Sequence, residues 1–132
     1  MSQENVEIVR RSWEAFATQG PDAVLPFLHP EVVLVDPDLP GGGKFEGHDG
    51  FLTFVRQVLD VFEDYRVEPE EFLDAGGERV VVFLRHQGRG KESGAPIELR
   101  DAHVWTIEDE KVTRIGLYLD RDKALEAAGM RE

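Results

Sequence analysis

PIELRDAHVWTIEDEKVTRIGLYLD, residues 96–120, is the most informative stretch of this sequence. Apolar, β-branched and aromatic residues alternate with polar ones on both sides of the charged segment EDEK, which predicts two strands, 96–107 and 111–120, joined by a tight turn. The preceding segments YRVEPEEFLDA at 65–75 and ERVVVFLRHQGRG at 78–90 have the same character and are separated by Gly-rich or charged turns. Together these segments predict a run of antiparallel hairpins.

The N-terminal half has helical spacing instead. Apolar residues recur there at three- and four-residue steps, which is typical of a helix with one buried face. Pro and Gly residues separate the segments, because neither residue extends a helix well. The elements predicted outside the meander are a helix from Ser2 to about Gln19, a short helical turn at 22–29, a strand EVVLVD at 31–36, a turn-rich loop at 37–44, a long helix within 45–62, and a short C-terminal helix within 120–130.

This order of elements predicts the fold class. Helices come first and long hairpin-connected strands follow, so helices and sheet are segregated, as in α+β folds. The chain of 132 residues has room for one domain, spanning 1–132. A twisted sheet curled over amphipathic helices does not always fill its centre, so we expect a largely apolar, ligand-sized pocket inside it.

Composition argues against several functions. The chain has 15 basic and 27 acidic residues, a formal charge of −12, which would repel nucleic acid and anionic membrane surfaces. It contains no cysteine, which excludes disulfides and thiolate chemistry. The N-terminal segment has no basic region followed by an apolar run, and no stretch of 18 apolar residues occurs. We therefore expect a cytoplasmic protein with neither a membrane nor a nucleic acid as its partner.

Asp36 is the first candidate for chemistry. It ends the predicted strand just before Pro37, where a carboxylate can project past the rim of the sheet into the pocket. The alternative is an aspartate that caps a turn, since Asp-Pro turns are frequent.

Strand alternation yields the next candidates. Asp101 and His103 share one face of their strand with Leu99, Trp105 and Ile107, and this set is more apolar than the other face. If that face points inward, the acid and the imidazole enter the pocket two residues apart, and burial favours their neutral forms. The alternative is a core histidine that is satisfied by its neighbouring acid.

Other strands and the first helix complete the expected pocket. Leu84 and His86 belong to an inward-facing set on the strand 78–90, and His86 would lie near the pocket mouth or form a half-exposed strand end. Ile115 and Leu119 face inward by the same alternation. Trp13, on the apolar face of the first helix, is expected in the pocket wall or the core.

Three segments carry a resemblance to a known family. HPEVVLVDP at 29–37, FEGHDGFLTF at 45–54 and AHVWTIEDEKVTRIGLYLD at 102–120 resemble the SnoaL-like group of the nuclear transport factor 2 (NTF2-like) superfamily. The resemblance covers nearly the whole chain and implies a cone in which a curved antiparallel or mixed sheet wraps over about three N-terminal helices. Members include ketosteroid isomerases, polyketide cyclases, dehydratases and proteins that only bind or dimerise, so the fold alone does not identify an activity.

The resemblance assigns expected roles. Asp36 matches the position of the general base in ketosteroid isomerases, enzymes in which a carboxylate moves a proton beside a carbonyl. Asp101 resembles their second, proton-holding acid if the following hairpin is one residue longer in this chain, and otherwise Ala102 aligns there. Trp13 stands roughly where the isomerases have an oxyanion-binding tyrosine. An indole N–H donates one hydrogen bond but is no phenolic acid.

The convex face of the sheet is a possible dimer interface. Tyr118 alternates away from Ile115 and Leu119, so we expect it on that face with Val112 and Gly116. In the superfamily this face often meets a second copy, and an apolar sheet surface with no helix over it favours a symmetric homodimer.

The leading expectation is an enzyme of isomerase, cyclase or dehydratase type that acts on a small apolar carbonyl compound without a cofactor. Asp36 would remove a proton, and Asp101 or His103 would hydrogen-bond the developing enolate oxygen. The alternative is a non-catalytic ligand-binding or dimerisation module. His86, Asp101 and His103 could together bind a metal if they converged, but hydrogen bonding explains the same residues, so we expect none.

Overall fold

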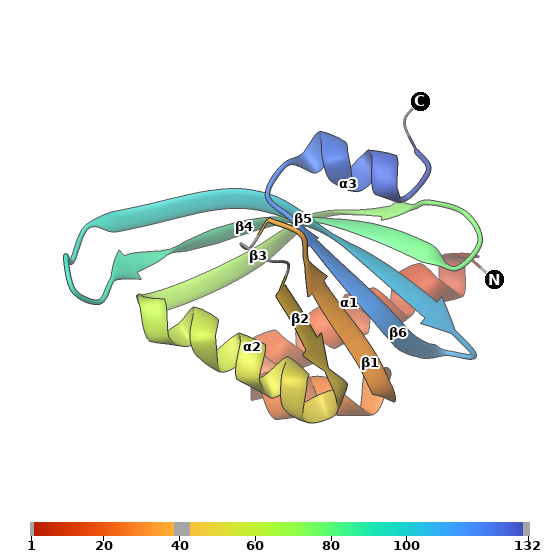
Figure 1. Cartoon of the computed structure of the whole chain (residues 1–132), viewed down its shortest axis with the longest axis horizontal. Helices are drawn as coiled ribbons and strands as arrows, with labels where there is room; N and C mark the ends of the chain where they lie inside the picture. Colours follow the sequence, from red (N-terminus) through yellow and green to blue (C-terminus); the bar gives the residue numbers. More distant parts are fainter. Residues whose placement is uncertain (1, 39–42, 131–132) are drawn as a thin grey trace.

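The computed structural model describes residues 2–38 and 43–130 of the chain. Four helical segments and six strands make up these residues (Figure 1). In chain order they are α1 (Ser2–Gln19), the 3₁₀ helix η1 (Pro21–Phe27), β1 (Leu28–Asp36), β2 (Gly43–Glu46), α2 (Gly47–Val61), β3 (Phe62–Asp74), β4 (Arg79–Gly90), β5 (Pro96–Glu108), β6 (Lys111–Tyr118) and α3 (Arg121–Ala127).

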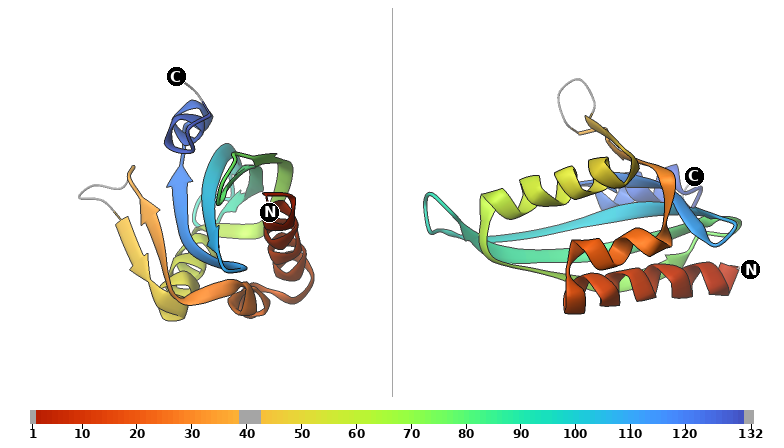
Figure 2. Two further views of the ribbon diagram at one scale, coloured as in Figure 1. Left: turned by 90° about the vertical axis from the view of Figure 1, so that its right-hand side faces the viewer. Right: turned by 90° about the horizontal axis from the view of Figure 1, so that it is seen from below.

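The strands form one mixed sheet in the order β2-β1-β6-β5-β4-β3. Strands β3 to β6 pair antiparallel with their sequence neighbours, whereas β1 pairs parallel with β6. The sheet curves over α1, η1 and α2, and α3 lies on its other side (Figure 2). The predicted α+β architecture, with a meander of long strands and a short C-terminal helix, is confirmed.

A short edge strand replaces part of the predicted loop and helix. Gly43–Glu46 pair antiparallel with β1, with Leu34 opposite Phe45. Gly47 then takes a positive φ of 73°, which turns the chain into α2 and suits a residue without a side chain. Residues 39–42 of the predicted loop lie outside the described residues.

The main core lies between the concave face of the sheet and the helices. Its fully buried residues alternate along the strands, and each buried Val or Leu contributes about 1.5–3 kcal/mol relative to an exposed position. Among the described residues, no helix is both long and apolar enough to cross a bilayer. The largest fully buried core side chains include Val9, Leu28, Val32, Leu34, Val80, Val82, Leu84, Ile107, Val112 and Ile115.

The convex face differs from the expectation at two points. The register of β5 and β6 shifts between Thr106 and Ile107, so that Ile107 pairs with Val112 and Val112 turns into the main core. This irregularity reverses the alternation that strict counting from Tyr118 predicts. The convex face is also not free of helices, because α3 packs on it through Ala124 and Ala128.

Tyr118 packs against this second, smaller core, as its alternation predicts, and it also borders the cavity described below. Beyond α3 the same face is charged, with ion pairs between Arg85 and Glu98 and between Arg100 and Glu70. Glu70 falls at an irregularity in the pairing of β3 with β4. A hydrogen bond from Arg121 is the main reason that the pKa of Glu70 is lowered.

Candidate functional site

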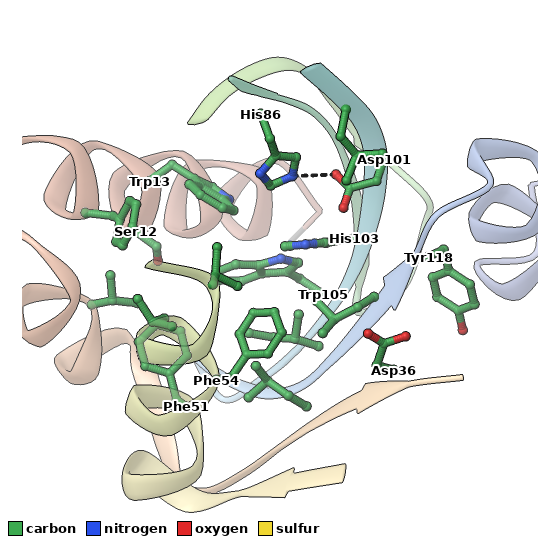
Figure 3. A pocket seen from close by; sticks show the side chains of 18 of the residues that line it. Ser12, Trp13, Asp36, Phe51, Phe54, His86, Asp101, His103, Trp105 and Tyr118 are labelled. Atoms are coloured by element: carbon green, nitrogen blue, oxygen red, sulfur yellow. Dashed lines mark hydrogen bonds and ion pairs between the residues drawn. The ribbon is translucent and has the colours of Figure 1, made fainter. Parts of the chain in front are cut away.

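A cavity of about 260 Å³ opens between the concave face of the sheet and the helices. One wall is apolar and comes mainly from α2, β1 and β6, which fold together because their apolar faces are buried. The opposite wall comes from β3, β4, β5 and α1 and carries most of the polar groups (Figure 3). Residues of the apolar wall include Leu34, Phe51, Phe54, Val55, Val58, Ile115 and Leu117.

Three side chains of the polar wall form a hydrogen-bonded chain across three neighbouring strands. Tyr65 Oη on β3 lies 2.6 Å from Nδ1 of His86 on β4, and His86 Nε2 lies 2.7 Å from Oδ1 of Asp101 on β5. When the imidazole is neutral and Asp101 is ionised, Nε2–H donates to the carboxylate and the Tyr65 hydroxyl donates to Nδ1. This chain fixes the orientation of all three groups.

The sequence interpretation did not include Tyr65 in the site. Val67 pairs with His86, and Tyr65 lies two residues before Val67 on the same strand. Extending the inward alternation of β3 back from Val67 would have found it. Burial, and secondly the charge of Asp101, raise the pKa of Tyr65, so its hydroxyl stays a neutral donor.

His103 lies deeper on the same wall of the cavity. Its side chain is buried, and this burial lowers its pKa from 6.5 to about 4, against an opposing contribution from nearby Asp101. The imidazole is therefore neutral near pH 7 and has one N–H donor and one acceptor nitrogen. Its Nδ1 has no hydrogen-bond partner among the described residues.

Asp36 borders the cavity from β1 (Figure 3). Its Oδ1 accepts a hydrogen bond from the backbone N–H of Asp38, so the residue also makes the turn-capping contact that the alternative interpretation expects. Val35 pairs with Gly116, and Leu117 pairs with His103. Asp36 thus lies beside Leu117 and about two strand spacings from His103, on the order of 10 Å.

Most of the other expected pocket residues also border the cavity. Trp13, Trp105, Ile115 and Leu119 line it, and Leu119 is 57 % exposed. Leu84 does not line the cavity and is fully buried in the core. The Leu84 side chain points to the concave side as expected, but it is part of the core beneath the cavity wall.

His86, Asp101 and His103 do not form a metal-binding cluster in the described residues. Asp101 bonds directly to His86, and no group of three His, Asp or Glu residues within 2–38 and 43–130 is arranged to hold an ion. The geometry is that of a hydrogen-bonded pair with a separate, buried imidazole.

Comparison with known proteins identifies one matching family and several similar structures. The model of the SnoaL-like domain matches residues 9–115. A solved NTF2-like protein of unknown function from Burkholderia pseudomallei K96243 is 30 % identical, with 93 % of this chain and 95 % of that chain covered and a TM-score of 0.77. TerC, co-crystallised with polyporic acid, is 31 % identical, with 96 % of this chain and 98 % of that chain covered and a TM-score of 0.76.

A third structure supports the fold alone. A protein from Jannaschia sp. CCS1, described as a SnoaL-like polyketide cyclase, is 20 % identical, with 98 % of this chain and 94 % of that chain covered and a TM-score of 0.74. No curated protein sequence matches the chain.

Proposed function

This chain belongs to the SnoaL-like domain family, and we propose that it binds a small apolar carbonyl compound in its cavity and catalyses a cofactor-independent isomerisation, cyclisation or dehydration. The observation that carries the proposal is the convergence of Asp36 and His103 on one apolar cavity from opposite sides of β6. A ligand between them can meet a base and a hydrogen-bond donor at once.

The proposed chemistry begins with proton transfer. Asp36 takes a proton from the carbon beside the carbonyl, and the electron pair of that C–H bond forms an enolate. The N–H of the neutral His103 donates to the enolate oxygen, which stabilises the developing charge in an apolar site. The proton held by Asp36 then moves to another carbon in an isomerisation. In a cyclisation the enolate carbon attacks a second carbonyl, and the new alkoxide oxygen takes this proton. In a dehydration the enolate expels a hydroxyl group, which takes the proton and leaves as water.

Asp101 is better suited to a positioning role than to contact with the enolate oxygen. An ionised carboxylate offers only acceptors, and one of its oxygens already receives the His86 bond. It donates to an enolate only in its protonated form. We therefore assign the oxyanion contact to His103, and we assign to Asp101, with His86 and Tyr65, the task of holding the polar wall in place.

Binding by a relative is consistent with the proposed ligand site. TerC, with 31 % identity over nearly the whole chain, was co-crystallised with polyporic acid. This supports the binding of a small organic molecule by the present chain. It does not indicate the reaction.

The rival proposal is a pocket that binds its ligand without catalysis. Trp13 favours this rival, because it supplies an indole where isomerases of the superfamily carry a phenolic acid. The two proposals differ in whether the bound compound is transformed.

The test uses a panel of hydrophobic ketones. Compounds that raise the thermal stability of the protein are binders, because a ligand of the folded form must stabilise it. Each binder is then incubated with the protein, and conversion is followed by chromatography. Asp36→Asn should slow conversion at least about a hundredfold. It should leave folding unchanged, because the Asn side-chain oxygen still accepts from Asp38.

Asp22→Asn is the matched control, because it makes the same chemical change at an exposed residue of η1, outside the cavity lining. Undiminished conversion by Asp36→Asn would remove Asp36 from the mechanism. Binding without any conversion would support the non-catalytic rival.

We further propose that the protein is a homodimer through the convex face of the sheet. The charged part of this face beyond α3 carries both signs, in the pairs of Arg85 with Glu98 and Arg100 with Glu70, so a two-fold arrangement can bring opposite charges together. Light scattering during gel filtration should give twice the chain mass of 14.9 kDa. A monomer at all concentrations would contradict the proposal.

A further inference from the structure

Three nitrogens stand out in the hydrogen-bond pattern of the described residues. Across residues 2–38 and 43–130, the buried side-chain nitrogens and oxygens that lack any partner are Trp13 Nε1, His103 Nδ1 and Trp105 Nε1. All three side chains line the same cavity. Unsatisfied groups are thus confined to one place, while the other polar groups of the wall, such as His86 and Asp101, are paired.

The three rings are also neighbours. The Trp13 ring centre lies 5.9 Å from that of His103 and 6.0 Å from that of Trp105. Figure 3 shows the rings together between α1 and β5, beside the hydrogen-bonded pair of His86 and Asp101. His103 and Trp105 are 8 % and 3 % exposed.

Leaving such groups without partners is unfavourable. A buried donor that has lost its water and gained no partner costs about 1–3 kcal/mol. A phenylalanine or leucine at these positions would pack as well without this cost. The opposite wall is built in that way, from residues such as Phe51, Phe54 and Leu34. Groups of this kind in a native protein therefore require an explanation, and a ligand is the one that their place in the cavity favours.

We propose that Trp13, Trp105 and His103 form a recognition site for an acceptor oxygen of the ligand, such as the ketone or enolate oxygen of an apolar compound. The inference rests on the proposed function and narrows its substrate class. Both indoles donate and cannot accept, so the recognised atom is an acceptor. Neutral His103 adds a third, adaptable contact. On binding, the rings turn their N–H groups toward the oxygen.

The site should discriminate against ligands that leave its buried N–H groups unpaired. A hydrocarbon of equal shape leaves the indole N–H groups unpaired. A ligand with a hydrogen-bond donor at this point would place that donor against the two indole N–H donors, so no hydrogen bond could form. Sites built to hydrogen-bond a ligand oxygen discriminate strongly against analogues that lack it, because the buried partner groups stay unsatisfied. Specificity for the oxygen thus comes from the wall that carries the two indoles and His103.

The experiment compares 1-tetralone with tetralin, which differ only by a carbonyl in place of a methylene group. Both tryptophans of the chain line the cavity, so both indole N–H signals in a ¹⁵N-labelled protein report on it. Tetralone should move at least one indole proton signal downfield, as hydrogen bonding does, and tetralin should not. Calorimetry should also show tighter binding of the ketone.

Variants test the same point independently. Trp13→Phe and Trp105→Phe should each weaken tetralone binding about five- to tenfold, the equivalent of one hydrogen bond, and change tetralin binding less than twofold. Phe54→Leu is the matched control. It alters the cavity wall without removing an N–H, so it should affect both compounds equally.

The outcomes are distinct. Equal binding of ketone and hydrocarbon, with no downfield indole shift, would overturn the oxygen site and leave the proposed apolar pocket in place. Equal weakening of both compounds by the tryptophan variants would assign the indoles to packing alone and also overturn it. Binding of neither compound would count against the proposed function itself. The NMR measurement on the unaltered protein stands even if a tryptophan variant fails to fold.

Discussion

His86 Nε2 on β4 lies 2.7 Å from Asp101 Oδ1 on the neighbouring strand β5. Both side chains are mostly buried, and each is 12 % exposed. On the far side of the imidazole, Tyr65 extends the contact to β3. Three strands are therefore joined at the cavity wall by side chains as well as by their backbone ladders, and this cross-link is expected to contribute to stability as well as to the site.

Tyr65→Phe should lower the free energy of unfolding by about 1–2 kcal/mol, because it leaves Nδ1 of a mostly buried imidazole without its donor. Chemical denaturation followed by circular dichroism would measure the change. Tyr118→Phe is the control, because Tyr118 also borders the cavity but its hydroxyl makes no hydrogen bond to the described residues, so it should change stability by less than about 0.5 kcal/mol. Equal effects of the two variants would contradict a structural role for the Tyr65 hydroxyl.

Asp101→Leu should destabilise the protein more than Asp101→Asn. The amide oxygen of Asn can still accept from His86 Nε2–H, whereas Leu leaves that donor unpaired at a cost of about 1–3 kcal/mol. Urea titrations at pH 7.5 would give both values. If Leu proved as stable as Asn, the contact between His86 and Asp101 would be dispensable for folding.

The lowered pKa of the buried His103 should make the free energy of unfolding depend on pH. Its pKa is about 4 in the folded protein and near 6.5 when unfolded, so the unfolded chain binds the extra proton between these values. The stabilisation is fully present above about pH 6.5 and is lost as the pH falls toward 4, by an amount on the order of 3 kcal/mol at most.

Two measurements check this prediction. NMR titration of the ring C–H signals should find His103 still neutral at pH 5.5. The wild-type protein should also lose more stability than His103→Gln between pH 6.5 and 4. An imidazole that titrates near 6.5 in the folded protein would show that burial does not control its charge.

Arg121 should anchor α3 to the strands of the site. Its guanidinium donates to the backbone oxygens of Leu84 and Asp101 and to Glu70, and it lies 4.4 Å from the centre of the Phe83 ring. Arg121→Ala should cost about 1–2 kcal/mol and should increase hydrogen exchange in α3. Lys123→Ala, at an exposed position of the same helix, should have little effect on either measurement.

Much of the site could be predicted from strand periodicity, because alternate residues of a strand necessarily point to the same side. That rule brought Asp101, His103 and Trp105 to one face, and the structure has all three on the cavity. The rule failed for Val112, where an irregularity in pairing reverses the alternation. Alternation also places Tyr65 on the inward face of β3, but its hydrogen bond to His86, 21 residues away, depends on how β3 pairs with β4.

The amino-acid pattern by itself determined the class of fold, the order of its elements and the inward faces of its longest strands, since these depend on local spacing and on which residues avoid water. Only the tertiary structure decided that His86 would pair with Asp101 and Tyr65, that α3 would cover part of the convex face, and that three buried ring nitrogens of one cavity would lack partners among the described residues. Those outcomes depend on how strands slide past one another and how far the sheet bends. Register and curvature are collective results of packing, and no short stretch of residues specifies them.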